Sequence, residues 1–173
     1  MGGLQRQDLK PLSAREVSNL IRPRLAETYG GPTRHEGTAL SPEQWLDTLA
    51  EAIRGELDCV SDAVGSARFA FVDEVVPEPD ALDALNQDGA ADVLRVFADG
   101  WARLPAYDYD TADAFFRELR RQFKEAQRLS GVHVMQSIRA ALTGSLGGPC
   151  LVVVSVLLGK DRCLERIRAA LRT

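Results

Sequence analysis

Five basic residues recur at helical spacing between residues 117 and 128, and their chemistry suits binding to a polyanion. In an α-helix, side chains three or four positions apart lie on one face, so these groups would form one basic stripe. Such a stripe can follow the phosphates of a nucleic acid. A solvated helix face explains the same pattern at least as well. The residues are Arg117, Arg120, Arg121, Lys124 and Arg128.

The charge of the chain is distributed unevenly, although its net value is only −4. Residues 43–116 hold 4 basic and 17 acidic groups, whereas residues 117–173 hold 11 basic and 4 acidic groups. A phosphate backbone would be attracted to the last third and repelled by the middle. The alternative is that the basic and acidic regions face each other inside the fold or across a dimer.

Residues suited to catalysis or metal binding are sparse. His35 and His133 are far apart, and neither has a cysteine or histidine at metal-ligand spacing, so we expect no zinc site. His133 is predicted to be a packed or surface residue. Asp108, Asp110 and Asp113 lie at a predicted helix start, where acidic groups favour the helix dipole, in preference to general acid–base chemistry. We predict no catalytic residue, no metal and no cofactor.

The chain also lacks signals for a membrane or an oxidising compartment. Its N-terminal residues have no apolar signal-peptide core. The longest apolar run, residues 150–158, is far shorter than the roughly 20 residues that a membrane helix needs. The three cysteines form no C-x-x-C pair, which favours buried thiols in a reducing compartment. We therefore expect a soluble, cytoplasmic protein with no membrane partner.

Local signals predict a mostly helical chain. Ser13 with Glu16, and Ser41 with Gln44, have the spacing of a capping box, so a helix should begin after each serine. Pro42 suits the first helical position. Apolar residues at helical spacing predict further helices over residues 80–85 (capped by Asp80), 90–104, 111–129, 135–142 and 162–172.

Three short segments give weaker signals. Residues 69–72 could be a strand, although we favour an extended, buried loop between helices. Ser130 and Gly131 are interpreted as the stop of the long helix before them. Residues 150–158 suit a buried strand as well as a helix, because valine dominates the run. Gly159 is expected to break that run.

Three motifs in the last third occur in a fixed order: SIRAALTG over residues 137–144, GPCL over residues 148–151 and LLGKDRCLERI over residues 157–167. They resemble the Leu-Arg-x-Ala-Leu-Thr-Gly, Gly-Pro-x-Leu and Leu-Gly-Lys-Glu-Arg motifs of bacterial glutamyl-tRNA synthetases. The resemblance extends over about residues 9–173 and is firmest from residue 116 onward. It concerns the C-terminal anticodon-binding region of that family.

The resemblance implies an all-α fold with two helical subdomains. Residues 1–105 would hold a linker helix and the first anticodon-binding subdomain, and residues 106–173 the second. The His-x-Gly-His and Lys-Met-Ser-Lys-Ser motifs of class I synthetases are missing, so the chain has no means of forming the adenylate by itself.

We therefore expect a stand-alone module that binds tRNA, with tRNA(Glu) as the candidate, and does not aminoacylate it. A helical scaffold repurposed to bind a protein partner, such as an enzyme, is one alternative. A fragment of a complete glutamate–tRNA ligase is another.

Residue by residue, the resemblance places Arg139, Gly148, Pro149 and Leu151 at the anticodon loop. A guanidinium can pair bidentately with a base edge or a phosphate, and unpaired bases are read at their edges and stacked on side chains. The competing interpretations are a salt bridge that orients the helix for Arg139 and an ordinary turn for the Gly-Pro step.

The basic stripe completes the predicted RNA-binding set. One departure from the family lies just before the first motif, where a lysine-rich step is replaced by GVHVM over residues 131–135. This replacement lowers the positive charge near the expected RNA surface. The stripe residues included in the set are Arg117, Arg121 and Lys124.

Overall fold

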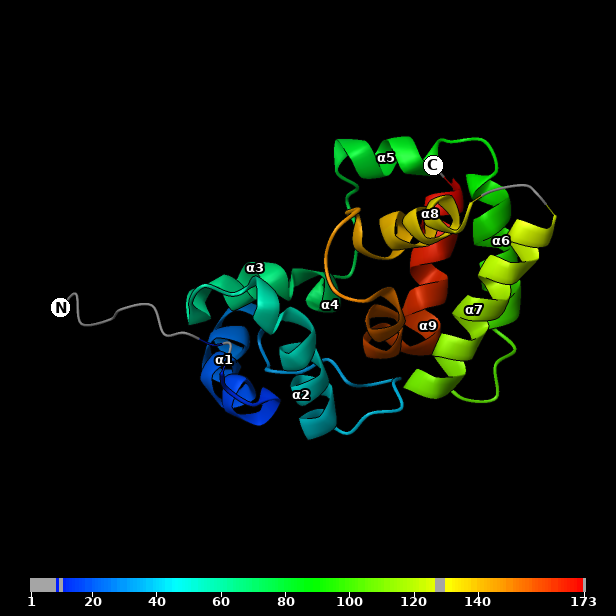
Figure 1. The fold of residues 1–173 in the computed structure, drawn as a ribbon. Coiled ribbons are helices and arrows are strands. Elements are labelled where there is room, and N and C mark those ends of the chain that lie inside the picture. Colours follow the sequence, from blue (N-terminus) through cyan, green and yellow to red (C-terminus); the bar gives the residue numbers. More distant parts are fainter. Residues whose placement is uncertain (1–8, 10, 127–129, 173) are drawn as a thin grey trace. The chain divides into compact units, whose positions relative to one another are not determined.

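The computed structural model describes residues 9, 11–126 and 130–172, and all regular structure in this part of the chain is helical (Figure 1). The predicted all-α class is confirmed. The helices form two compact units. The first contains the described residues up to Glu36 and Leu40–Val72, and the second contains Gly37–Ala39 and the chain from Asp73 onward.

The first unit begins each long helix at the capping residue that the sequence predicts. Ser13 and Ser41 each accept a hydrogen bond from the backbone N–H three residues later, and the Glu16 and Gln44 side chains accept one in return. Each box satisfies backbone donors that a helix start leaves without partners. The elements are α1 (Ala14–Tyr29), α2 (Pro42–Ile53), η1 (Arg54–Glu56), η2 (Val60–Asp62), α3 (Ala63–Ser66) and α4 (Arg68–Phe71).

Residues 69–72 differ from the expectation, because Arg68–Phe71 forms the helical turn α4 in place of a strand or an extended loop. Phe71 stacks on Tyr29, with ring centroids 4.4 Å apart, and meets the fully buried Trp45 edge-on at 5.3 Å. A four-residue apolar run has no periodicity to separate helix from strand. The aromatic contacts that bury Phe71 come from residues distant in the sequence.

Asp47 of α2 ties α1 to α2. Its carboxylate accepts hydrogen bonds from the Arg15 guanidinium at 2.8–3.1 Å and from the Ser18 hydroxyl at 2.6 Å. These donors, Arg15 foremost, hold the pKa of Asp47 below its ordinary value. The pair is partly open to solvent, which screens the attraction.

We expect Asp47→Asn to lower the free energy of unfolding by about 1 kcal/mol at neutral pH. A carboxylate with a depressed folded-state pKa contributes its stability above its unfolded pKa of about 3.9, and this contribution is lost as the pH falls through the folded value. The difference in free energy of unfolding between wild type and Asp47→Asn, measured by urea unfolding, should therefore shrink as the pH falls. Glu27→Gln removes the same charge from an exposed position of α1 and should leave the free energy of unfolding unchanged. A difference for Asp47→Asn that does not depend on pH would contradict the role given to the Asp47 carboxylate.

The second unit packs four helices around α8 (Figure 1). α8 contacts α5, α6, α7 and α9, and buries Val134, Ile138 and Ala141 among them. α8 is therefore the central helix of the second unit. The elements are α5 (Pro79–Leu85), α6 (Ala90–Trp101), α7 (Tyr109–Glu125), α8 (Gly131–Thr143) and α9 (Leu151–Arg172).

Two local expectations in this unit were wrong, and one open alternative is resolved. Ser130 does not stop a helix but caps the start of α8, where its hydroxyl accepts the His133 N–H at 3.3 Å. Of the two alternatives for residues 150–158, residues 151–158 form a helix, because the first part of α9 is buried on most sides and needs no polar face. The cap of α5 is Glu78, not Asp80, because Pro79 occupies the first helical position. Gly159 interrupts α9, as expected.

The predicted division after residue 105 falls between α6 and α7, inside the second unit. Phe97 and Trp101 of α6 lie against Phe115 and Phe116 of α7, with ring centroids 5.4–6.5 Å apart. The compact units of the structure part at Val72. A functional division at residue 105 stays a prediction.

Candidate nucleic-acid interface

The basic stripe predicted from the sequence lies on the exposed face of α7. Its opposite face packs into the core through Phe116, Leu119 and Phe123. Asp108 fixes the start of the helix by accepting the Thr111 N–H at 2.9 Å. The exposed basic residues are Arg117, Arg120, Arg121 and Lys124, whereas Arg128 lies outside the described residues.

Acidic neighbours on α7 pair with two of the four described basic residues of this stripe. Arg117 pairs with Asp113 at 2.9 Å. Arg121 lies between Glu118 and Glu125 and bonds to both, so the two carboxylates raise the pKa of the guanidinium and Arg121 lowers the pKa of Glu118. An ion-paired cation is less available to a phosphate, so these positions are weaker candidates for RNA contact than the sequence suggested.

Arg120 and Lys124 form no ion pair with another described residue. Arg120 faces the start of α8, where its Cδ lies 3.8 Å from the position that a Cβ on Gly131 would occupy. The long side chain of Arg120 therefore extends across the gap between α7 and α8. Arg120 of the stripe therefore lies close to α8, the helix that carries Arg139.

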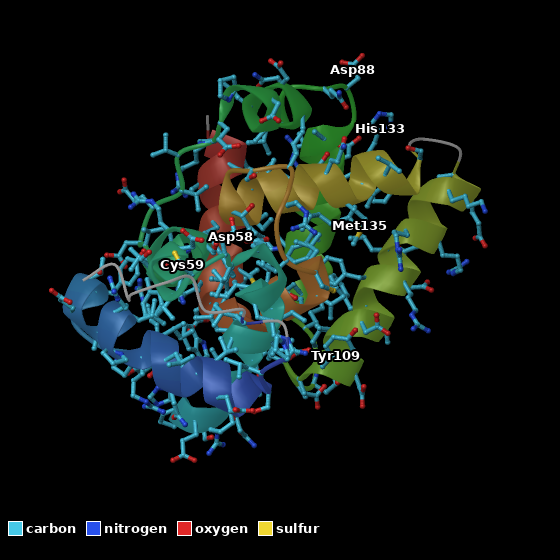
Figure 2. All side chains as sticks on the ribbon, turned by 60° about the vertical axis from the view of Figure 1, so that its left-hand side comes forward. Asp58, Cys59, Asp88, Tyr109, His133 and Met135 are labelled. Atoms are coloured by element: carbon cyan, nitrogen blue, oxygen red, sulfur yellow. The ribbon has the colours of Figure 1, made fainter. Side chains whose placement is uncertain are left out.

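Arg120 and Arg139 line one open hollow of about 500 Å³ between α7 and α8. Met135, which Figure 2 labels on α8, is one of its lining residues. Val132 is 64% exposed and Met135 is half-buried, so the hollow has apolar lining as well as two arginines. Its other lining residues are Ser130, Gly131 and Gln136.

Arg139 is half-buried and joins α8 to the loop of residues 144–150. Its Nη1 donates a hydrogen bond of 2.6 Å to the carbonyl of Pro149. Gly147 and Gly148 are exposed beside it, and Gly148 adopts φ 122°. We call the hollow together with Gly147 and Gly148 the α7–α8 surface. Arg139 thus organises the loop and also lines the hollow.

The structure places two of the predicted contact residues in the core. Pro149 is buried and Leu151 is 2% exposed. Their side chains hold the start of α9 and are closed to a base, although the backbone of the loop remains accessible at Gly147 and Gly148. The sequence interpretation missed Val132, Met135 and Gln136, because only the packing of α7 on α8 brings them beside Arg120.

The described residues contain no group of three or more histidine, cysteine or carboxylate side chains that could hold a metal ion. The His133 Nδ1 lies 3.0 Å from the Ser130 Oγ at the exposed start of α8, and burial raises the pKa of the Cys163 thiol. In the same part of the chain, no helix has the length and apolar character that a bilayer crossing requires.

Comparison with known proteins shows the family to which most of the chain belongs. The family model described as "Anticodon binding domain" matches residues 16–171. A glutamate–tRNA ligase of Thermus thermophilus is 29% identical over 160 residues, which are 92% of this chain and 31% of that protein. The glutamate–tRNA ligase of a Synechococcus species is 30% identical over 173 residues, which are 97% of this chain and 33% of that protein.

The fold also occurs in a solved structure. The crystal structure of a glutamate tRNA ligase from Elizabethkingia meningosepticum in complex with its amino acid superposes with a TM-score of 0.76 at 19% identity. The match covers 95% of this chain and 30% of that one. The chain therefore spans about a third of the length of these relatives. The resemblance predicted from the three motifs is confirmed.

Proposed function

The chain belongs to the family of anticodon binding domains, and we propose that it binds the anticodon loop of a tRNA through the α7–α8 surface. One observation carries the proposal: Arg120 and Arg139 line one open hollow together with the apolar Val132 and Met135. Guanidinium groups pair with phosphates and base edges, and apolar side chains support unstacked bases. The chain itself supplies recognition and no chemistry.

We further propose tRNA(Glu) as the RNA, because the curated relatives described above are glutamate–tRNA ligases. The chain spans about a third of those proteins, which favours a role within a longer synthetase. In that role the chain would select the tRNA, while ATP binding and glutamate transfer would occur on other residues. Pull-down after nuclease treatment distinguishes this role from a scaffold that binds a protein partner.

The test is direct binding of the whole chain to tRNA(Glu) and to an unrelated tRNA, at low and moderate salt. Tighter binding of tRNA(Glu) at both salt concentrations supports the proposal. Equal affinity for both RNAs would show that the surface binds RNA through its charge and does not recognise the anticodon. Negligible retention of both at low salt would refute RNA binding.

Two adjacent arginines of α7 provide a sharper prediction. We expect Arg120→Gln to weaken binding about tenfold and to lower the slope of log affinity against log salt by about one. Arg121→Gln removes the same charge from a guanidinium already held by Glu118 and Glu125, so we expect at most about a threefold change. Fluorescence anisotropy with a labelled anticodon stem–loop measures both. Equal effects would mean that only the net charge of α7 matters.

A further inference from the structure

The loop of residues 144–150 is anchored at the end of α8. Gly144 ends α8 in the left-handed conformation at φ 77°, and its N–H donates to the carbonyl of Ala140 at 2.9 Å. The Glu78 N–H donates to the carbonyl of Gly144 at 2.8 Å. At the far end, Arg139 holds the carbonyl of Pro149. The exposed glycines therefore lie between two fixed points.

Arg166 of α9 supplies a further bond to this anchor. It is only 5% exposed, and its Nη1 donates to the carbonyl of Leu142 at 2.7 Å. The last carbonyls of a helix have no partner within the helix, so this bond satisfies one of them. Thr143 adds to the same turn, because its hydroxyl donates to the carbonyl of Arg139 at 2.9 Å and lies 3.2 Å from the Ser145 N–H.

Arg166 acts from outside the α7–α8 surface. It lines a separate hollow of about 400 Å³ together with Ala140 and Ala141, and Arg139 is not part of that lining. Removing a guanidinium from water is costly, and an apolar side chain of similar volume often stabilises a core equally well. Its bond to the Leu142 carbonyl offsets part of that cost and also fixes the end of the helix that carries Arg139.

We propose that Arg166 is a positioning residue for RNA binding. It fixes the last turn of α8, so that Arg139 reaches the carbonyl of Pro149 and the loop presents Gly147 and Gly148 in one conformation. Without this bond the loop would sample several conformations, and RNA binding would have to order them at a cost in affinity. The inference rests on the proposed anticodon binding.

The experiment compares Arg166→Met and Arg166→Lys with Arg168→Met in the whole chain. Arg168 is exposed on α9 and loses the same charge. Affinity for an anticodon stem–loop of tRNA(Glu) is measured at several salt concentrations, and circular dichroism verifies folding. We expect Arg166→Met to bind at least about tenfold more weakly with an unchanged salt slope. Arg166→Lys should recover part of the loss, and Arg168→Met should stay within about twofold of wild type.

Thr143→Val tests the same turn without altering a buried charge. If Arg166→Met does not fold, this variant decides whether the last turn of α8 positions the loop for RNA binding. It should weaken binding in the same direction, again without a change of salt slope. A folded Arg166→Met, or in its absence Thr143→Val, with wild-type affinity overturns the positioning role. A salt slope lowered by about one would also overturn it, because Arg166 would then contact a phosphate directly. If the wild type itself does not bind, the proposed function fails together with this inference.

Discussion

Gly159→Ala should lower the free energy of unfolding by about 3–5 kcal/mol, the largest stability effect that we expect for a single methyl group in this chain. Gly159 adopts φ 76° and ψ −176°, a backbone region that is essentially restricted to glycine. A Cβ there would lie 2.5 Å from the carbonyl oxygen of Gly37, which packs against the break in α9. Both the backbone strain and the steric clash oppose the substitution.

Gly147→Ala is the matched control, because a Cβ on Gly147 meets no atom within 4 Å. Its effect should be within about 0.5 kcal/mol. Urea unfolding followed by the fluorescence of Trp101, in a Trp45→Phe background, reports on the second unit. Similar midpoints for Gly159→Ala and Gly147→Ala would show that α9 can rearrange around the break and that the contact with Gly37 is dispensable.

Arg139→Met should reduce affinity for the anticodon stem–loop by about 100-fold while the chain stays folded. The substitution removes a guanidinium from the hollow and also releases the carbonyl of Pro149. These two losses act together, since the direct contact and the shape of the loop depend on one side chain. Fluorescence anisotropy at fixed salt measures the loss, and thermal unfolding verifies the fold.

Arg103→Met removes the same charge from the turn just after α6, where the side chain is 78% exposed and 4.0 Å from its acidic neighbour Asp99. It should change the affinity by less than about twofold. If both variants lost affinity equally, long-range charge would explain RNA binding, and a direct contact from Arg139 would be excluded as its cause. If neither lost affinity, Arg139 would take no part in RNA binding and its bond to the Pro149 carbonyl would be structural only.

Local signals in the sequence predicted the starts and stops of several helices. Ser13 and Ser41 form their capping boxes with residues three positions away, so no tertiary information is needed. Gly159 was also identified correctly, because a glycine requirement at a helix break is local. Ser130 was misread, since the same residue types end one helix and begin another.

The parts of the fold and of the site that were not predicted depend on packing between residues distant in the sequence. The valine-rich start of α9 became a helix because its neighbours bury it on most sides, and a short apolar run cannot reveal this. The basic stripe was found, but the sequence did not indicate that Arg121 is held by two glutamates while Arg120 faces α8. The bond from Arg166 to Leu142 spans 24 positions, which no spacing pattern predicts.

The most direct test of the central claim is the hydrogen-exchange difference of the whole chain with and without an anticodon stem–loop of tRNA(Glu). We predict slower exchange concentrated in residues 130–150, which contain α8 and the loop after it. A stem–loop with the same stem and an unrelated anticodon should protect this region less. Binding with no protection in residues 130–150 would contradict the claim that the α7–α8 surface holds the unpaired nucleotides.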